Sequence, residues 1–253
     1  MPHDYGGIII MIWGTFSPAH IISLIFAALV GFGLHFLLKH RSDRTQTIVL
    51  GILSFSGIVA IIYNLLAWNS PLEYLPFHLC SLGAVVLPIA VFTKNKVLSN
   101  LLLLWSLGSY MALLLNYAVA EAELFSPVFC FFYFPHVLEC VIPILLFTLK
   151  RSSLDARCTL STVLITFTAF TVIHFINLGL NAYCMNNEIL DYAGNIIQVN
   201  YMYSIVPENP LLALFYSIVP YPYWYMLLCL PVAAVYLGVI YGVHGMVKKM
   251  KSK

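Results

Sequence analysis

The twelve lysine and arginine residues of this sequence all lie after every second apolar segment. The N-terminal stretch and the remaining connections contain no lysine or arginine. Seven long apolar segments can be recognised, at 18–38, 46–68, 76–93, 97–119, 127–149, 158–184 and 222–246. The basic residues lie after the first, third, fifth and seventh segments. Because cytoplasmic connections carry the excess of Lys and Arg, the pattern predicts an outside N-terminus and a cytoplasmic C-terminus. An odd number of spans also requires the two termini to lie on opposite sides of the membrane, so the number of spans and the predicted orientation agree.

Length and composition predict one all-α membrane bundle of seven transmembrane helices. Each segment has about the 20 residues that cross about 30 Å of hydrocarbon, and 61% of the chain is hydrophobic while 9% is charged. We therefore expect a single transmembrane domain over 1–253. An exterior loop or lid at 185–221 would carry a short outer half-helix at about 211–219, and 247–253 would form a basic cytoplasmic tail. The six cysteines have no metal-binding spacing and imply no disulfide framework.

Polar side chains within the spans gather in the outer half of the bundle when the predicted orientation is applied. They are His20, Asn64, His78, Cys80, Asn116, His136, Glu139, His174 and Asn177. Glu139 is the only acidic residue within a span. Ionisable groups are costly inside a membrane and usually face the bundle interior or a water-filled cavity, so the asymmetry predicts a polar site that opens to the exterior.

Two helix faces are expected to form that site. His136 and Glu139 are three residues apart and share one face, and His174, Asn177 and Asn181 share another at spacings i, i+3 and i+7. Turned inward, the two faces would build one polar pocket. The alternative is that these side chains only form hydrogen bonds between helices.

Cys80 is the candidate nucleophile. It follows Pro76 at the start of the third segment, where unpaired N–H groups and the helix dipole favour an anion and hence the thiolate. His78 is two residues away, about 200° around a helix, so it faces elsewhere. A base for Cys80 would then come from another span, as His136 or His174. The alternative is a buried, inert cysteine.

Four stretches, in their order and spacing, resemble the YwaF-type integral membrane proteins of bacteria, a family related to the animal transmembrane protein 164 family. The stretches are Thr15–His20, Leu75–Cys80, Asn200–Tyr203 and Pro220–Tyr225, and the resemblance covers about 20–225. The animal relative is regarded as an acyltransferase that moves fatty acyl chains between phospholipids through a cysteine acyl-enzyme. The resemblance implies that Cys80 is the nucleophile and His136 or His174 the base, and it adds Asn200 and Tyr201 to the substrate-binding candidates His20, Asn64, His78, Asn116, Glu139 and Asn177.

The leading hypothesis is a lipid acyltransferase or acyl hydrolase in a bacterial plasma membrane. Its partner would be a membrane phospholipid or lyso-phospholipid, with no cofactor and no nucleic acid. Asn177 or Asn116 would donate to the oxyanion of the tetrahedral intermediate, and Glu139 would orient its neighbours. A zinc hydrolase that uses His78, His136, Glu139 and His174 is a second hypothesis. The non-enzymatic alternative is a seven-span transporter or small-molecule sensor.

Overall fold

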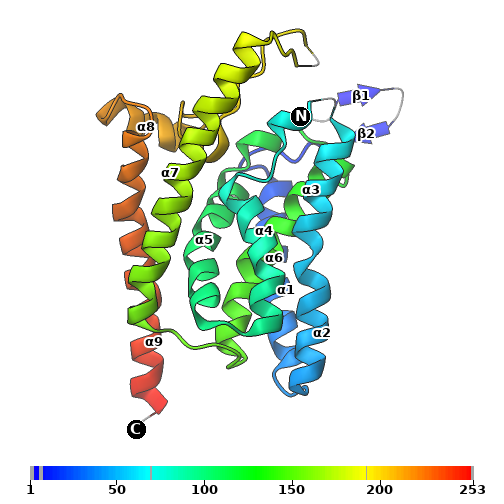
Figure 1. The fold of residues 1–253 in the computed structure, drawn as a ribbon. Helices are drawn as coiled ribbons and strands as arrows, with labels where there is room; N and C mark the ends of the chain where they lie inside the picture. The colour runs from blue at the N-terminus through cyan, green and yellow to red at the C-terminus, as the bar shows by residue number, and fades with distance from the viewer. Residues whose placement is uncertain (1–2, 6–7, 69, 192, 252–253) are drawn as a thin grey trace. The chain divides into compact units, whose positions relative to one another are not determined.

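The protein, described here as a computed structural model over residues 3–5, 8–68, 70–191 and 193–251, is helical apart from one short hairpin (Figure 1). In the hairpin, β1 (His3–Tyr5) pairs antiparallel with β2 (Ile8–Ile10). The α-helices are α1 (Pro18–Leu38), α2 (Asp43–Ser54), α3 (Ser56–Ala67), α4 (Leu79–Thr93), α5 (Lys96–Leu115), α6 (Pro127–Thr148), α7 (Ala156–Asn186), α8 (Pro210–Ile218) and α9 (Cys229–Lys251). Four single-turn 3-10 helices accompany them: η1 (Pro71–Glu73), η2 (Tyr117–Val119), η3 (Tyr201–Tyr203) and η4 (Trp224–Leu228).

Six helical stretches of the described chain are long and apolar enough to cross a membrane, which confirms a multi-pass integral membrane protein. They are Pro18–Leu38, Asp43–Ala67, Lys96–Leu115, Pro127–Thr148, Ala156–Asn186 and Trp224–Met250. The segment predicted as the third span forms α4, which has 15 residues. At 1.5 Å per residue α4 is about 22 Å long, shorter than the hydrocarbon core.

The chain divides into two compact units, Met1–Cys158 and Thr159–Lys253. In the first unit α6 is the central helix, because it contacts each of α1 to α5. Over the most apolar window of each helix, 56% of the residues of α5 and α6 are buried within the protein, against 11% for α1. Ile142 and Leu146 of α6 are fully buried. More than half of the side chains in this window of α6 are therefore held by neighbouring helices, while Phe134 and Ile144 of α6 stay exposed.

The segment 46–68, predicted as the second span, lies within one candidate crossing, Asp43–Ala67. Its helix is interrupted at Phe55, which separates α2 from α3. The hydroxyl of Ser54 donates to the carbonyl of Gly51 at 2.6 Å, and Phe55 N–H donates to the carbonyl three residues before it. Gly51 leaves room for the Phe92 ring, which would lie 2.6 Å from a Cβ at that position. A glycine and serine close together are a recognised cause of helix kinks.

One segment before α1 packs back onto the unit. Trp13 is fully buried; its backbone N–H donates to the carbonyl of Ala122, and its indole N–H donates to Ser23 Oγ at 3.0 Å. Ser17 then caps α1 by accepting from the N–H of His20, and its hydroxyl donates to the carbonyl of Trp13. The segment is fixed by buried polar contacts as well as by its rings.

Arg151 is one of the basic residues that predict the orientation in the membrane, and it also links two helices. Its side chain is 2% exposed; one guanidinium nitrogen lies 2.8 Å from an Asp43 carboxylate oxygen, and the other donates to Thr47 Oγ1 at 2.7 Å and to the carbonyl of Val91 at 3.3 Å. The guanidinium fork thus ties the start of α2 to the end of α4. The basic residue predicted to set orientation also holds these helix ends together.

The second unit contains α7, the loop that follows it, α8, η4 and α9. The hydroxyls of Thr159 and Tyr241 meet at 2.8 Å, joining α7 to α9. The predicted half-helix is confirmed as α8, nine residues long and N-capped by Asn209. Tyr216 of α8 meets Tyr225 of η4 edge to face, at 5.2 Å between ring centroids. The segment predicted as the tail continues α9 as helix to Lys251.

Candidate functional site

Cys80 lies in the first turn of α4, as the sequence predicts. The helix begins at Leu79 after His78, whose extended backbone makes it the N-cap, so Pro76 precedes the helix instead of standing in its first turn. The first N–H groups of a helix have no partner within it. Cys80 is half-buried and therefore lies among backbone donors inside the bundle.

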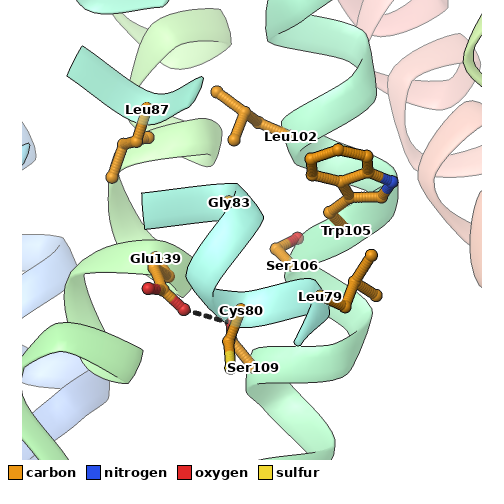
Figure 2. Close-up of a pocket in the computed structure, with 9 residues that line it drawn as sticks. All are labelled: Leu79, Cys80, Gly83, Leu87, Leu102, Trp105, Ser106, Ser109 and Glu139. Atoms are coloured by element: carbon orange, nitrogen blue, oxygen red, sulfur yellow. Dashed lines mark hydrogen bonds between the residues drawn. The ribbon is translucent and has the colours of Figure 1, made fainter. Parts of the chain in front are cut away.

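A small cavity connects Cys80 with α5 and α6. Its volume is about 10 Å³, close to what a single water molecule requires. Cys80, Ser109 and Glu139 supply polar atoms, and the rest of the lining is mostly apolar. Figure 2 shows these three side chains toward one end and Leu87 and Leu102 at the other. Residues from three helices thus place a thiol, a hydroxyl and a carboxyl on the lining of one small cavity.

Glu139 is the centre of this cluster. It is 8% exposed, and one carboxyl oxygen accepts a hydrogen bond from Ser109 Oγ at 2.7 Å (Figure 2). The carboxyl lies within electrostatic range of both Cys80 and His136. Pro143 stands four residues after Glu139 and has no N–H to give to the Glu139 carbonyl, so α6 lacks one helical bond at this level.

Close helix packing brings α3 to the same place. A Cβ on Gly57 would lie 2.5 Å from Ala84 Cβ and 3.2 Å from the second carboxyl oxygen of Glu139. Any larger residue would separate α3 from α4 or displace the carboxyl. Gly57 therefore permits the contact that encloses Glu139.

His136 lies one turn before Glu139 and is half-buried. Its Nδ1 is 2.7 Å from the carbonyl of Phe132, and its ring stacks on that phenyl ring at 4.3 Å between centroids. Because a carbonyl only accepts, Nδ1 carries a proton, and the neutral ring keeps the lone pair on Nε2. This tautomer provides the basic nitrogen that proton abstraction needs.

His174 belongs to the second unit, where its Nδ1 is 3.0 Å from Ser204 Oγ. Ser204 is fully buried, and its hydroxyl also accepts from Asn177 Nδ2 at 2.9 Å. The ring of His174 lies 5.0 Å from the ring of Tyr223. These contacts hold His174 against the chain that follows α7. Its predicted role as a base for Cys80 stays a prediction.

The asparagines of α7 contact backbone. Asn177 accepts from the N–H of Tyr201 at 3.0 Å and donates to the carbonyl of the same residue at 2.8 Å. Asn181 does the same with Val199, at 2.7 and 3.0 Å. Residues four apart on a helix are about 6 Å apart along its axis, close to the about 6.6 Å between alternate residues of an extended chain. The spacing of the two amides therefore matches that of Tyr201 and Val199, and the four residues form a ladder of hydrogen bonds between α7 and the segment 199–201.

Other predicted substrate-binding residues make contacts within the protein. Asn200 Oδ1 accepts from the N–H groups of Ile205 and Val206, and Asn200 Nδ2 donates to Glu208 at 2.6 Å. Burial raises the pKa of the Glu208 carboxyl. Tyr201 is 1% exposed. Roles for Asn200 and Tyr201 in binding substrate stay predictions, and their present contacts shape the loop.

His20 and Asn116 join the ends of α1 and α5. His20 is fully buried; its Nδ1 accepts from the N–H of Phe16 at 2.9 Å, so its Nε2 carries the proton and donates to the carbonyl of Leu113 at 2.8 Å. Asn116 accepts from Thr15 Oγ1 at 2.7 Å. Both nitrogens of His20 are therefore engaged.

Two predicted residues lie near helix ends and are not among the residues that line the cavity. Asn64 is half-buried near the end of α3, and His78 is the half-buried N-cap of α4. Among the residues that the structure describes, no three His, Cys, Asp or Glu side chains are close enough to hold a metal ion. The zinc hypothesis therefore lacks a gathered ligand set within this part of the chain.

Three important residues were missed by sequence reasoning: Ser109, Gly57 and Ser204. Each is small and common in membrane helices and loops, so its identity carries little signal by itself. Ser106 and Ser109 do stand three apart on one face of α5, a pattern that could have indicated a polar partner for Glu139. Gly57 and Ser204 required the tertiary structure.

Comparison with known proteins gives one match. Residues 15–241 match the family model described as the TMEM164 family. No curated protein and no solved structure matches the chain.

Proposed function

Because the chain belongs to the TMEM164 family, we propose that it is a membrane-embedded lipid acyltransferase or acyl hydrolase that uses Cys80 as its nucleophile. The observation that carries the proposal is that Cys80 and Glu139 line one small cavity, with His136 one helical turn before Glu139. A thiol, an imidazole with a free Nε2 lone pair and a hydrogen-bonded carboxyl are the groups that cysteine acyl transfer requires. The YwaF-type resemblance points to the same chemistry.

The proposed topology has seven spans, with the N-terminus outside and the C-terminus cytoplasmic, in a bacterial plasma membrane. The distribution of the twelve basic residues supports it. In this arrangement α4 is the third crossing, and its 15 residues leave the non-helical approach through 74–78 at membrane depth. Such backbone is tolerated where protein surrounds it. Cys80 would then lie below the outer surface, within the outer half of the hydrocarbon layer.

In the proposed first step, Cys80 Sγ attacks the ester carbonyl carbon of a phospholipid, and its proton passes to His136 Nε2. The carbonyl oxygen takes the negative charge, and N–H groups of the first turn of α4 are the nearest donors for it. Collapse of the intermediate breaks the ester C–O bond. The leaving lyso-phospholipid oxygen takes the proton from His136, and the acyl group remains on Cys80 as a thioester.

In the second step, the hydroxyl of a lyso-phospholipid, or water, attacks the thioester carbonyl and gives its proton to His136 Nε2. Cys80 leaves as the thiolate and recovers that proton. The products are a remodelled phospholipid or a free fatty acid. The amides of Asn177 and Asn116 already serve other partners, so we assign the oxyanion to backbone donors. Glu139 positions the site and does not exchange a proton in either step.

Lipid mass spectrometry on vesicles that contain purified protein tests the proposal. Replacing the nucleophile with Cys80→Ala should lower acyl transfer by about 1000-fold or more, and Cys80→Ser, which keeps the size, should also be strongly impaired. Cys158→Ala, a half-buried cysteine away from the cavity, is the matched control. Full transfer by folded Cys80→Ala protein would overturn the mechanism. Solute uptake by wild-type vesicles without lipid turnover would favour the transporter alternative.

A further inference from the structure

An apolar groove of about 330 Å³ lies where the α2–α3 break faces α6. The volume falls within the about 300–1,000 Å³ typical of ligand pockets. Its walls carry large apolar side chains: Ile52, Phe55 and Val59 on one side, and Phe131, Phe134 and Leu138 on the other. Ser56 and Cys130 are the polar side chains in its lining, and no charged side chain is among them. The groove is suited to an uncharged, apolar ligand.

The position of the groove identifies its surroundings. Phe55 stands at the middle of the 25-residue candidate span Asp43–Ala67, so the groove lies near the centre of the hydrocarbon layer. Ile52 is 69% exposed and Val59 51%. A groove open at this depth is bathed by lipid acyl chains, and a long hydrocarbon chain is the apolar ligand that the membrane supplies there.

The groove and the Cys80 cavity share their two walls. On α6, Pro135 and Leu138 line the groove while the neighbouring Glu139 lines the cavity. On α3, Ser56 lines the groove while the next residue, Gly57, approaches the Glu139 carboxyl. The groove is therefore at the same level of the bundle as the cavity, on its membrane side.

We propose that this groove binds the acyl chain of the phospholipid whose ester reacts at Cys80, so that the substrate approaches laterally from the bilayer. This inference rests on the proposed function for the reaction that follows binding. Phe55, at the break between α2 and α3, is one of the residues that line the groove. The Cys80 cavity alone, at about 10 Å³, has no room for an acyl chain.

The test is photo-crosslinking of full-length protein in phosphatidylcholine vesicles. A small fraction of the lipid carries a diazirine near the end of one acyl chain, and mass spectrometry maps the adducts. Adducts should concentrate in 52–59 and 130–138. Val59→Trp and Ile52→Trp, which fill the groove from its two ends, should each reduce them several-fold. Leu29→Trp, at a lipid-exposed position of α1 with 60% exposure, is the matched control.

Two results would overturn the inference: adducts spread evenly over all exposed helices, or adducts in the groove that survive both filling variants. The same mapping in the Cys80→Ala variant separates this inference from the proposed function, because crosslinking needs no catalysis. If Cys80→Ala protein forms groove adducts and still transfers acyl chains fully, the groove proposal stands and the cysteine mechanism is wrong. If Cys80→Ala protein loses acyl transfer and no groove adducts form, the cysteine mechanism stands and the groove proposal is wrong.

Discussion

The two units use similar polar side chains in opposite ways. In Met1–Cys158, Glu139 and Ser109 meet side chain to side chain between α6 and α5, beside Cys80. In Thr159–Lys253, Asn177 and Asn181 each contact the N–H and C=O of one loop residue. The first arrangement places reactive groups around a cavity, whereas the second joins α7 to the backbone of the loop that follows it.

The difference shows that polar residues on one face of a membrane helix do not by themselves predict which groups they will contact. His136 and Glu139 share a face, and so do His174 and Asn177, at the same spacing of three. What separates them is the partner. The interior of a packed helix offers no free backbone N–H, so the Glu139 carboxyl accepts from the Ser109 side chain instead. An irregular segment offers many backbone groups, and Asn177 and Asn181 of α7 contact these.

The largest expected effect is the difference in acyl transfer between two single variants, His136→Asn and His174→Asn. An asparagine amide can replace Nδ1 and cannot replace Nε2. His136→Asn should keep the contact with Phe132 and lower acyl transfer by about 10²–10⁴-fold, the usual contribution of a general base. His174→Asn should keep the contact with Ser204 and retain transfer near the wild-type level. Rates measured by lipid mass spectrometry check both. The reverse ranking would move the site to the second unit.

A large loss of stability is expected from Asn177→Leu. The change removes the amide that contacts the buried N–H and C=O of Tyr201 and the hydroxyl of Ser204, and each buried polar group that loses a partner costs about 1–3 kcal/mol. We expect destabilisation of about 2–5 kcal/mol in detergent unfolding and faster proteolysis within 199–206. Asn187→Leu, at an exposed position with one bond to Tyr183, is the control and should change stability by less than about 0.5 kcal/mol. Equal effects would contradict the ladder.

A moderate effect is expected from Gly57→Ala. The new methyl group would lie 2.5 Å from Ala84 Cβ, and overpacking of this kind costs about 1–3 kcal/mol. Because the methyl group also crowds the Glu139 carboxyl, transfer should fall in protein that remains folded. Gly33→Ala, where nothing lies within 4 Å, is the matched control and should preserve both properties. Unchanged melting temperature for Gly57→Ala would show that α3 and α4 can separate freely.

The smallest effect concerns pH. Lys96 Nζ lies 2.6 Å from Asp155 Oδ2, and this hydrogen bond, with the N–H of Arg157, holds the pKa of Asp155 below its usual value. A depressed carboxyl pKa gives stability that is present above the unfolded pKa of about 3.9 and is lost as pH falls through the folded pKa. Lys96→Met should therefore lower the melting temperature slightly at pH 6, and the difference should shrink toward pH 3. A difference that grows in acid would contradict the assigned sign.

Much of the helical framework could be predicted from the sequence. Apolar length alone indicated the crossings, and the Pro210 segment was predicted as a short helix that α8 confirms. The break at Phe55 could not be predicted from composition, because it depends on Ser54 contacting Gly51 and on the Phe92 ring from another helix. Likewise the start of α4 at Leu79 depends on the His78 backbone, although Pro76 suggested an earlier start.

For the candidate site, residue type indicated Cys80, His136 and Glu139 as groups that a membrane interior does not hold without reason. The sequence could not show that Glu139 would meet Ser109, or that Gly57 would admit both. It also could not distinguish His174 from His136, because the relevant partner of His174 is Ser204, thirty residues later in the chain.

The sequence by itself determined that this chain crosses a membrane repeatedly, since hydrocarbon thickness fixes the length of apolar helices and buried charge is expensive. Only the tertiary structure decided which polar side chains face each other and which hold backbone. Hydropathy is summed along the chain residue by residue. A hydrogen bond across helices depends on register, on kinks and on the absence of a side chain at Gly57, and those are properties of packed helices.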